Sequence, residues 1–247
     1  MRKIIMTLFT GGFLLTTGVS YAKKHITDQQ IQAEIQDRLY HASVFKHGQV
    51  QATYDNGVVT LTGSVDSLGV KDDAARAVRK APDVSKIVNN ITINAEDITD
   101  RQIALSARKQ VVLYPFFTVF DWATFRSQNH HLQVSGYVTE PYKKIDIGRL
   151  MERVKGVTEV QNDIKVLPTS VDDDQVRMAI ARAIYTDPYF AGYGNQPIPP
   201  IHIIVDNLNV TLYGVVNSPV DRQKAEQDAR FAATYFSLTD KLSVEHE

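Results

Sequence analysis

Cysteine is absent from this chain of 247 residues. Its absence excludes disulfides, thiolate metal sites and a lipid anchor on a cysteine after a cleaved leader. Beyond the N-terminal region there is no hydrophobic run of the roughly 20 residues that a membrane-spanning helix needs. A surplus of one charge is lacking as well, because 27 basic and 28 acidic side chains give a net charge of −1. This balance argues against a nucleic-acid-binding protein, which usually carries a basic surplus.

Recognisable catalytic motifs are also missing. The chain has no Gly-x-Ser-x-Gly elbow, no His-Glu-x-x-His and no phosphate-binding Gly-x-x-x-x-Gly-Lys. The adjacent pair His130 and His131 is a poor metal chelate, since successive side chains of a strand point to opposite faces. The acidic run Asp172-Asp173-Asp174 is compatible with a cation site, but its place at a helix start favours capping. We therefore predict no enzymatic activity, no metal and no cofactor.

The N-terminus has the layout of a secretory signal peptide. Arg2 and Lys3 precede an apolar run from Ile4 to Thr17, and Ser20-Tyr21-Ala22 follows as a small-x-small site. We predict a signal peptide over residues 1–22, with cleavage after Ala22. The alternative is a retained membrane anchor, for which the apolar run is short. A cysteine-free exported chain favours the periplasm as its location.

The chain contains an internal repeat. Gly63, Gly136 and Gly214 each close a β-like run, and apolar residues recur at matching distances after each of them. Upstream of each glycine lies a helix pattern with apolar residues every four positions: Ile31/Ile35/Leu39, Ile103/Ala107/Val111 and Val176/Ile180/Ile184. We predict three tandem domains after the signal peptide: repeat 1 (residues 23–95), repeat 2 (96–167) and repeat 3 (168–247).

Each repeat reads as helix, strand, strand, helix, strand. In repeat 1, Asn56-Gly57 stands between two alternating strands, which is a strong hairpin signal. The second helix then crosses over to a third strand, Ile87 to Ile93, and a right-handed crossover sets it parallel to the strand before the helix. The expected fold class is α+β, with three tandem αββαβ modules. Each module is a three-stranded mixed sheet with two helices on one face.

These residues resemble a known family. Asn56-Gly-Val-Val-Thr-Leu-Thr-Gly-Ser-Val65 and Val84-Ser-Lys-Ile-Val-Asn-Asn-Ile-Thr-Ile93 look like parts of a BON domain (bacterial OsmY and nodulation). The resemblance is most specific in repeat 1 and weakest in repeat 2. It implies attachment to membranes and a role in envelope maintenance or osmotic stress. The implied partner is an anionic phospholipid or envelope surface.

Repeat 2 supplies the candidate site. An aromatic stretch from Leu113 to Trp122 follows its first helix, and basic residues lie on or near both helices. Aromatic rings beside cations suit an anionic membrane surface. The alternative is that the rings fill the core and strand of this repeat. The predicted lipid-binding residues are Phe116, Phe117, Arg108, Lys109, Lys143 and Lys144.

The repeats differ in charge. Repeats 1 and 2 each carry +1 (nine basic and eight acidic, ten and nine), whereas repeat 3 carries −5 (six and eleven). Repeat 3 also has a Pro- and Gly-rich stretch, Asp187 to Pro200, which we predict to be a long loop. A protein-interaction or chaperone-like scaffold with a protein partner on repeat 3 is therefore the second hypothesis. The short linkers 95–97 and 167–169 predict a semi-rigid array.

Overall fold

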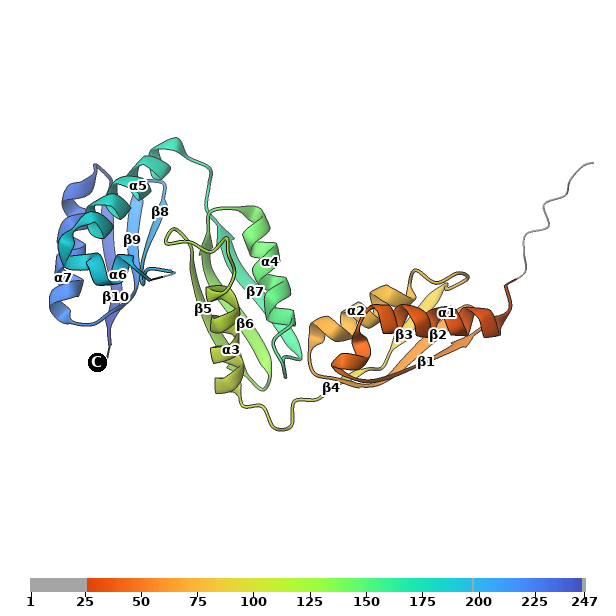
Figure 1. Ribbon diagram of the computed structural model, residues 1–247. Coiled ribbons are helices and arrows are strands. Elements are labelled where there is room, and N and C mark those ends of the chain that lie inside the picture. The colour runs from red at the N-terminus through yellow and green to blue at the C-terminus, as the bar shows by residue number, and fades with distance from the viewer. Residues whose placement is uncertain (1–25, 197, 246–247) are drawn as a thin grey trace, which may run out of the picture.

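The computed structural model describes residues 26–196 and 198–245 (Figure 1). The predicted signal peptide lies outside this range. Within the described residues, no helix combines the length and the apolar character needed to cross a bilayer. Three modules follow one another along the chain, each with two long helices on one face of a small sheet. The predicted α+β fold class is confirmed.

Repeat 1 begins with a helix that a threonine caps at its N-terminus. Thr27 accepts from the amide of Gln30 while the Gln30 side chain accepts from the Thr27 amide, which is a capping box. Repeat 2 begins in the same way at Thr99. The elements of repeat 1 are α1 (Asp28–His41), η1 (Val44–Lys46), β1 (Gly48–Asp55), β2 (Val58–Val65), α2 (Leu68–Val78), β3 (Lys86–Asn89) and β4 (Thr92–Ile93).

Repeats 2 and 3 follow the same order. Repeat 2 consists of α3 (Asp100–Val112), β5 (Trp122–Gln128), β6 (His131–Val138), α4 (Pro141–Glu152) and β7 (Glu159–Val166). Repeat 3 consists of α5 (Val171–Thr186), η2 (Pro188–Phe190), α6 (Ala191–Gly194), β8 (Ile201–Asp206), β9 (Asn209–Val216), α7 (Pro219–Ala232) and β10 (Ser237–Val244).

Two details differ from the prediction. The third strand of repeat 1 is split into β3 and β4, both paired with β2, where one strand was expected. The stretch from Asp187 to Pro200 was predicted as a loop but contains the short helices η2 and α6. Proline at the first position of η2 explains this start, since its fixed φ suits a first helical turn.

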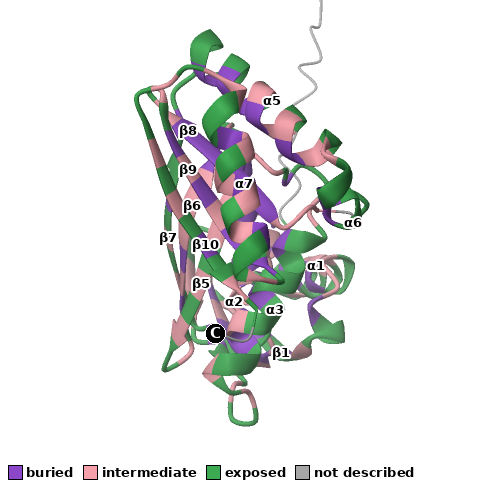
Figure 2. Cartoon of the chain, turned by 90° about the vertical axis from the view of Figure 1, so that its left-hand side faces the viewer, coloured by how far each residue is buried: buried purple, intermediate pink, exposed green. Residues whose placement is uncertain are grey.

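All three sheets have the predicted mixed topology. In each, the two strands of the hairpin pair antiparallel, and the strand after the second helix pairs parallel with the middle strand. Helices cover one face of each sheet, and buried residues gather between the layers (Figure 2). The residues predicted to form the buried stripes are all buried: Ile31, Ile35, Leu39, Ile103, Ala107, Val111, Val176, Ile180 and Ile184.

The repeated glycine has a steric cause. Gly63, Gly136 and Gly214 have φ of +113°, +146° and +130°, values that L side chains rarely adopt. A Cβ atom at any of them would lie 2.0 Å or less from a backbone carbonyl oxygen of the neighbouring segment of the hairpin. That oxygen belongs to Gln49, Trp122 or Pro200, respectively. Only glycine fits this close approach, so each repeat carries one at the same place.

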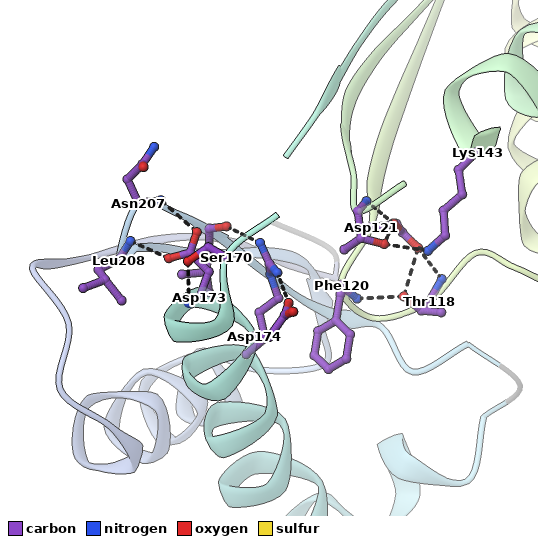
Figure 3. A network of polar contacts seen from close by, with 12 residues as sticks. Thr118, Phe120, Asp121, Lys143, Ser170, Asp173, Asp174, Asn207 and Leu208 are labelled. Carbon is purple, nitrogen blue, oxygen red and sulfur yellow. Dashed lines mark hydrogen bonds and ion pairs between the residues drawn. The ribbon is translucent and has the colours of Figure 1, made fainter. Parts of the chain in front are cut away.

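The hairpin turn of repeat 3 explains the role of Asp173 in the acidic run Asp172-Asp173-Asp174. Asn207 and Leu208 both have positive φ, which strains a bulky residue such as leucine. The carboxylate of Asp173 accepts from both of their backbone amides, at 3.0 and 2.8 Å (Figure 3). The helix itself is capped by Ser170. Asp173 therefore stabilises the hairpin turn, and Ser170 caps the helix. We had predicted that the acidic run caps the helix.

Repeat 2 has the equivalent arrangement. Asp100 accepts from the amides of Asn129 and His130, at 2.8 and 2.9 Å, and from the hydroxyl of Ser127 at 2.6 Å. These bonds, led by the one from Ser127, lower the pKa of Asp100. In repeat 1 the turn is Asn56-Gly57, and glycine adopts positive φ without strain.

The two junctions between repeats differ in kind. Repeats 1 and 2 meet through polar groups: Arg153 Nη2 lies 2.9 Å from Asp73 Oδ2, and Lys155 Nζ lies 3.1 Å from Asp66 Oδ2. The amide of Gly156 donates to the carbonyl of Asp66 at 2.9 Å. These contacts favour the semi-rigid arrangement predicted from the short linkers.

The junction of repeats 2 and 3 is largely apolar. Phe120 of repeat 2 packs against the core of repeat 3, and Ile198 of repeat 3 packs against the core of repeat 2. One backbone bond joins them, from the amide of Ile203 to the carbonyl of Val119 at 2.7 Å. The two sheets lie along one side of the molecule and their helices along the other (Figure 2).

Candidate functional site

The connection between α3 and β5, residues 113–121, carries the exposed ring of the candidate site. Phe116 is 54% exposed, and its ring lies edge-on to Tyr114 at 5.6 Å and to Tyr142 at 5.9 Å. The hydroxyl of Tyr114 donates to Asp146 Oδ2 at 2.7 Å. Burial raises the pKa of Tyr114 and this bond raises it further, so the hydroxyl stays protonated and keeps its donor role.

Repeat 2 exposes two further large apolar side chains that the sequence did not single out. Leu113 is 67% exposed and Ile145 is 55% exposed. The available signal was the presence of apolar residues outside the four-residue stripes of α3 and α4, since such residues face away from the core. We call the following set the repeat-2 helical face: Leu113, Phe116, Tyr142 and Ile145, with the cations Arg108 and Lys109.

The predicted cations fall into two groups. Arg108 and Lys109 are exposed near the end of α3. Lys144 is half-buried on α4, and its backbone carbonyl accepts from the side-chain amide of Asn162 at 2.9 Å. Cations in the last turn of a helix also offset the negative end of its dipole, so Lys109 has a local structural role.

Phe117 does not lie on the surface as predicted. Its side chain is only 9% exposed and packs in the core of repeat 2. Its ring lies 5.7 Å from the ring of His202 in repeat 3. The alternative weighed from the sequence, that rings of this stretch fill the core, holds for Phe117 and not for its neighbour Phe116.

Lys143 is the second correction. It is 4% exposed, and its Nζ donates to Asp121 Oδ2 at 2.7 Å and to the hydroxyl of Thr139 at 2.8 Å (Figure 3). The carboxylate of Asp121 is 0% exposed and also accepts from the amides of Thr118 and Thr139. This buried pair fixes the end of the 113–121 connection against α4, so Lys143 cannot meet a membrane surface.

A sequence signal for the burial of Lys143 existed. It stands seven residues after Gly136, and Val70 and Asp221 stand seven residues after the corresponding glycines. All three are buried. Lys143 also lies one and two turns before Ile147 and Met151, which are buried on the same helix.

The equivalent position of repeat 3 anchors the segment predicted as a loop. Asp221 accepts from the hydroxyls of Tyr189, at 2.6 Å, and Tyr193. Burial and this bond raise the pKa of Tyr193 to about 12. The segment from Asp187 to Pro200 is thus tied to α7. The most exposed large apolar side chains of the described part of this repeat are Phe231 (79%) and Phe236 (78%).

Comparison with known proteins gives a family match over most of the chain. The model of the BON domain family matches residues 27–95, 125–168 and 172–244. Residues 96–124, which hold α3 and the connection with Phe116, lie outside the matched ranges.

Individual relatives are distant. The "Uncharacterized protein in gshII 5'region" of Anaplasma centrale is 25% identical over 149 residues, which is 57% of this chain and 95% of that protein. The C-terminal domain of CdsD, from the type III secretion system of Chlamydia trachomatis, is 15% identical, with 85% of this chain and 96% of that chain covered and a TM-score of 0.24. The periplasmic domain of PrgH from S. typhimurium is 10% identical, with 83% and 99% covered and a TM-score of 0.19.

Proposed function

The chain belongs to the BON domain family, and on this premise we propose that it is a non-enzymatic periplasmic protein that binds anionic phospholipid surfaces through repeat 2. The family is non-catalytic. We assign the protein to envelope maintenance or to the response to osmotic stress, which the family resemblance implies. The predicted signal peptide supports the periplasmic location, and fractionation of cells would test it.

One observation carries the proposal: an exposed phenylalanine and two exposed cations occur within one short stretch of repeat 2, residues 108–116. Phe116 is 54% exposed, held edge-on between two tyrosines, and Arg108 and Lys109 lie exposed at the end of the preceding helix. A ring of this kind enters the interfacial layer of a bilayer. Each cation near an anionic surface adds about 1 kcal/mol to binding.

The charge of the repeats supports an orientation. Repeat 3 carries −5, so it is repelled by an anionic surface, whereas repeats 1 and 2 each carry +1. We propose that repeat 2 faces the membrane and that repeat 3 points away from it.

Vesicle flotation tests the proposal. The full mature chain should float with vesicles of phosphatidylglycerol and phosphatidylcholine at low salt, and not with phosphatidylcholine alone. Phe116→Ala and Lys109→Gln should each weaken flotation several-fold. Phe231→Ala is the matched control, because it removes a phenylalanine ring that is even more exposed (79%) from the acidic repeat. Equal losses for Phe116→Ala and Phe231→Ala, or flotation without anionic lipid, would contradict the proposal.

The exposed rings of repeat 3 favour a second candidate function, a protein-interaction or chaperone-like scaffold. Phe231 and Phe236 are among the most exposed large apolar side chains of the described chain. Aromatic residues of this kind are enriched at protein interfaces. Crosslinking in the periplasm followed by mass spectrometry should then recover one dominant protein partner, and Phe236→Ser should abolish that crosslink without changing flotation.

A further inference from the structure

A groove lies on the helix-free faces of the sheets of repeats 2 and 3, where the two repeats meet. Its volume is about 370 Å³, within the range of sites that hold small molecules. Three aromatic and three polar residues line most of it: Trp122, Tyr137, Tyr213, Ser135, Asp163 and Lys165. None of them belongs to the repeat-2 helical face.

Strand register places these side chains together. Trp122 pairs with Tyr137, and Tyr137 pairs with Lys165, across the three strands of repeat 2. Ser135 pairs with Asp163 in the next row. This row lies on the same face, because side chains of a strand alternate with a period of two. The sheet thus sets an aromatic row beside a polar row.

The rings form a platform and not a cage. Trp122 and Tyr213 are stacked, with centroids 5.2 Å apart and planes 15° apart. Tyr137 is tilted by 34° to Tyr213 at 6.2 Å. Lys241 lies over the ring of Tyr213 at 5.3 Å, which disfavours a cationic ligand there. Trp122 and Tyr213 cover part of one another's faces, so Tyr137 and the uncovered part of Trp122 offer flat ring surface to a ligand.

The polar side chains that line the groove carry no net charge. Lys165 contributes one positive charge and Asp163 one negative charge. Asp163 is held in place, since its Oδ2 accepts from the side-chain amides of Gln133 at 2.6 Å and Gln161 at 2.9 Å. A fixed carboxylate and an ammonium side by side offer both acceptors and donors, which suits a ligand that carries many hydroxyl groups.

We propose that this groove binds an uncharged oligosaccharide of pyranose rings with equatorial hydroxyls. The C–H face of such a ring stacks on the platform of Trp122 and Tyr137, and its hydroxyls exchange hydrogen bonds with Ser135, Asp163 and Lys165. Tyr213 belongs to repeat 3, so the platform is complete only when repeats 2 and 3 are docked. The site is independent of membrane binding and uses a different face of repeat 2.

The chain has a built-in reporter, because Trp122 is its single tryptophan. Titration of the mature protein with chitotetraose or cellotetraose should give a saturable change in Trp122 fluorescence, confirmed by isothermal titration calorimetry. Tyr137→Ala should weaken binding by about tenfold, the scale of losing one stacking ring. Tyr40→Ala removes an exposed tyrosine from repeat 1 and should leave the affinity unchanged.

Lys165→Ala provides a second variant if Tyr137→Ala impairs folding, which circular dichroism would reveal. Lys165 is exposed at the groove edge, so its loss should weaken binding without unfolding the sheet. No saturable signal with either sugar, affinity unchanged in both variants, or equal affinity for glycerol phosphate would overturn the proposal. Vesicle flotation should be unaffected by both variants, so failure here and failure of the membrane proposal are distinguishable.

Discussion

At the residue scale, two pairs of neighbours decide what repeat 2 presents to its surroundings. Phe116 is exposed and Phe117 is in the core; Lys144 is half-buried and Lys143 is buried. Each pair consists of two residues of the same type. The difference comes from partners distant in sequence, such as Asp121 for Lys143.

The Lys143–Asp121 pair predicts an asymmetric mutational result. Lys143→Met should lower the free energy of unfolding of repeat 2 by about 3 kcal/mol, because it leaves a buried carboxylate without its cation. The double variant Lys143→Met/Asp121→Asn should recover much of this loss. Denaturant unfolding followed by Trp122 fluorescence measures both. Equal stabilities of the single and double variants would show that the pair is not coupled.

The repeated glycine gives a second prediction. Gly136→Ala should destabilise repeat 2 by at least about 2 kcal/mol, since the new Cβ would lie 1.9 Å from the carbonyl oxygen of Trp122. Gly192→Ala is the control, because nothing lies within 4 Å of a Cβ at that position. Its effect should stay within about 0.5 kcal/mol. Thermal unfolding of both variants, compared with the unsubstituted chain, provides the test.

At the element scale, the hairpin of repeat 3 depends on a helix carboxylate. Asp173→Ala should cost about 2 kcal/mol, because it removes two charge-assisted hydrogen bonds from a turn with positive φ at Asn207 and Leu208. Leu208→Gly in that background recreates the Asn-Gly turn of repeat 1 and should restore part of the stability. Hydrogen exchange at the Asn207 amide would report the turn directly. Unchanged protection in Asp173→Ala would contradict this account.

The β8 strand carries a buried histidine at the junction of repeats 2 and 3. His202 is 6% exposed, its Nδ1 is buried without a partner, and its ring lies 5.1 Å from Trp122. Burial lowers the pKa of His202 below its ordinary value of 6.5, and nearby Arg108 acts in the same direction. Hydrogen bonds to the backbone of Asp121 and Thr118 and the charge of Asp121 oppose the shift without cancelling it.

The sign of the pH effect follows from this lowered pKa. The undocked state binds a proton near the ordinary value, so docking is fully stable above about pH 6.5 and weakens as the pH falls below it. Lowering the pH from about 7.5 to about 5 should change Trp122 fluorescence in the original chain. His202→Gln, which cannot be protonated, should abolish that change. A pH response that persists in His202→Gln would place the titrating group elsewhere.

At the scale of the whole molecule, the two junctions should respond differently to salt. The ion pairs of Arg153 and Lys155 with Asp73 and Asp66 join repeats 1 and 2, whereas apolar packing joins repeats 2 and 3. Salt screens exposed ion pairs, since the Debye length is about 3 Å at 1 M. Its effect on apolar packing is a weak strengthening. Repeat 1 should therefore gain freedom at high salt while repeats 2 and 3 stay docked.

Small-angle scattering at low and high salt measures this difference. The radius of gyration should rise with salt, and the variant Arg153→Gln/Lys155→Gln should already show the larger value at low salt. Trp122 fluorescence should not change in either case, because it reports the other junction. Separation of repeats 2 and 3 under these conditions would contradict the prediction.

The sequence by itself determined the three repeats, the buried stripes of α1, α3 and α5, and the recurrence of Gly63, Gly136 and Gly214. These features arise from periodicity and backbone conformation, which neighbouring residues control. Only the tertiary structure decided which ring of repeat 2 faces outward, how Asp173 and Asp100 act, and that Trp122 and Tyr213 meet. Each of these depends on contacts between segments far apart in the chain, and local spacing carries no information about such partners.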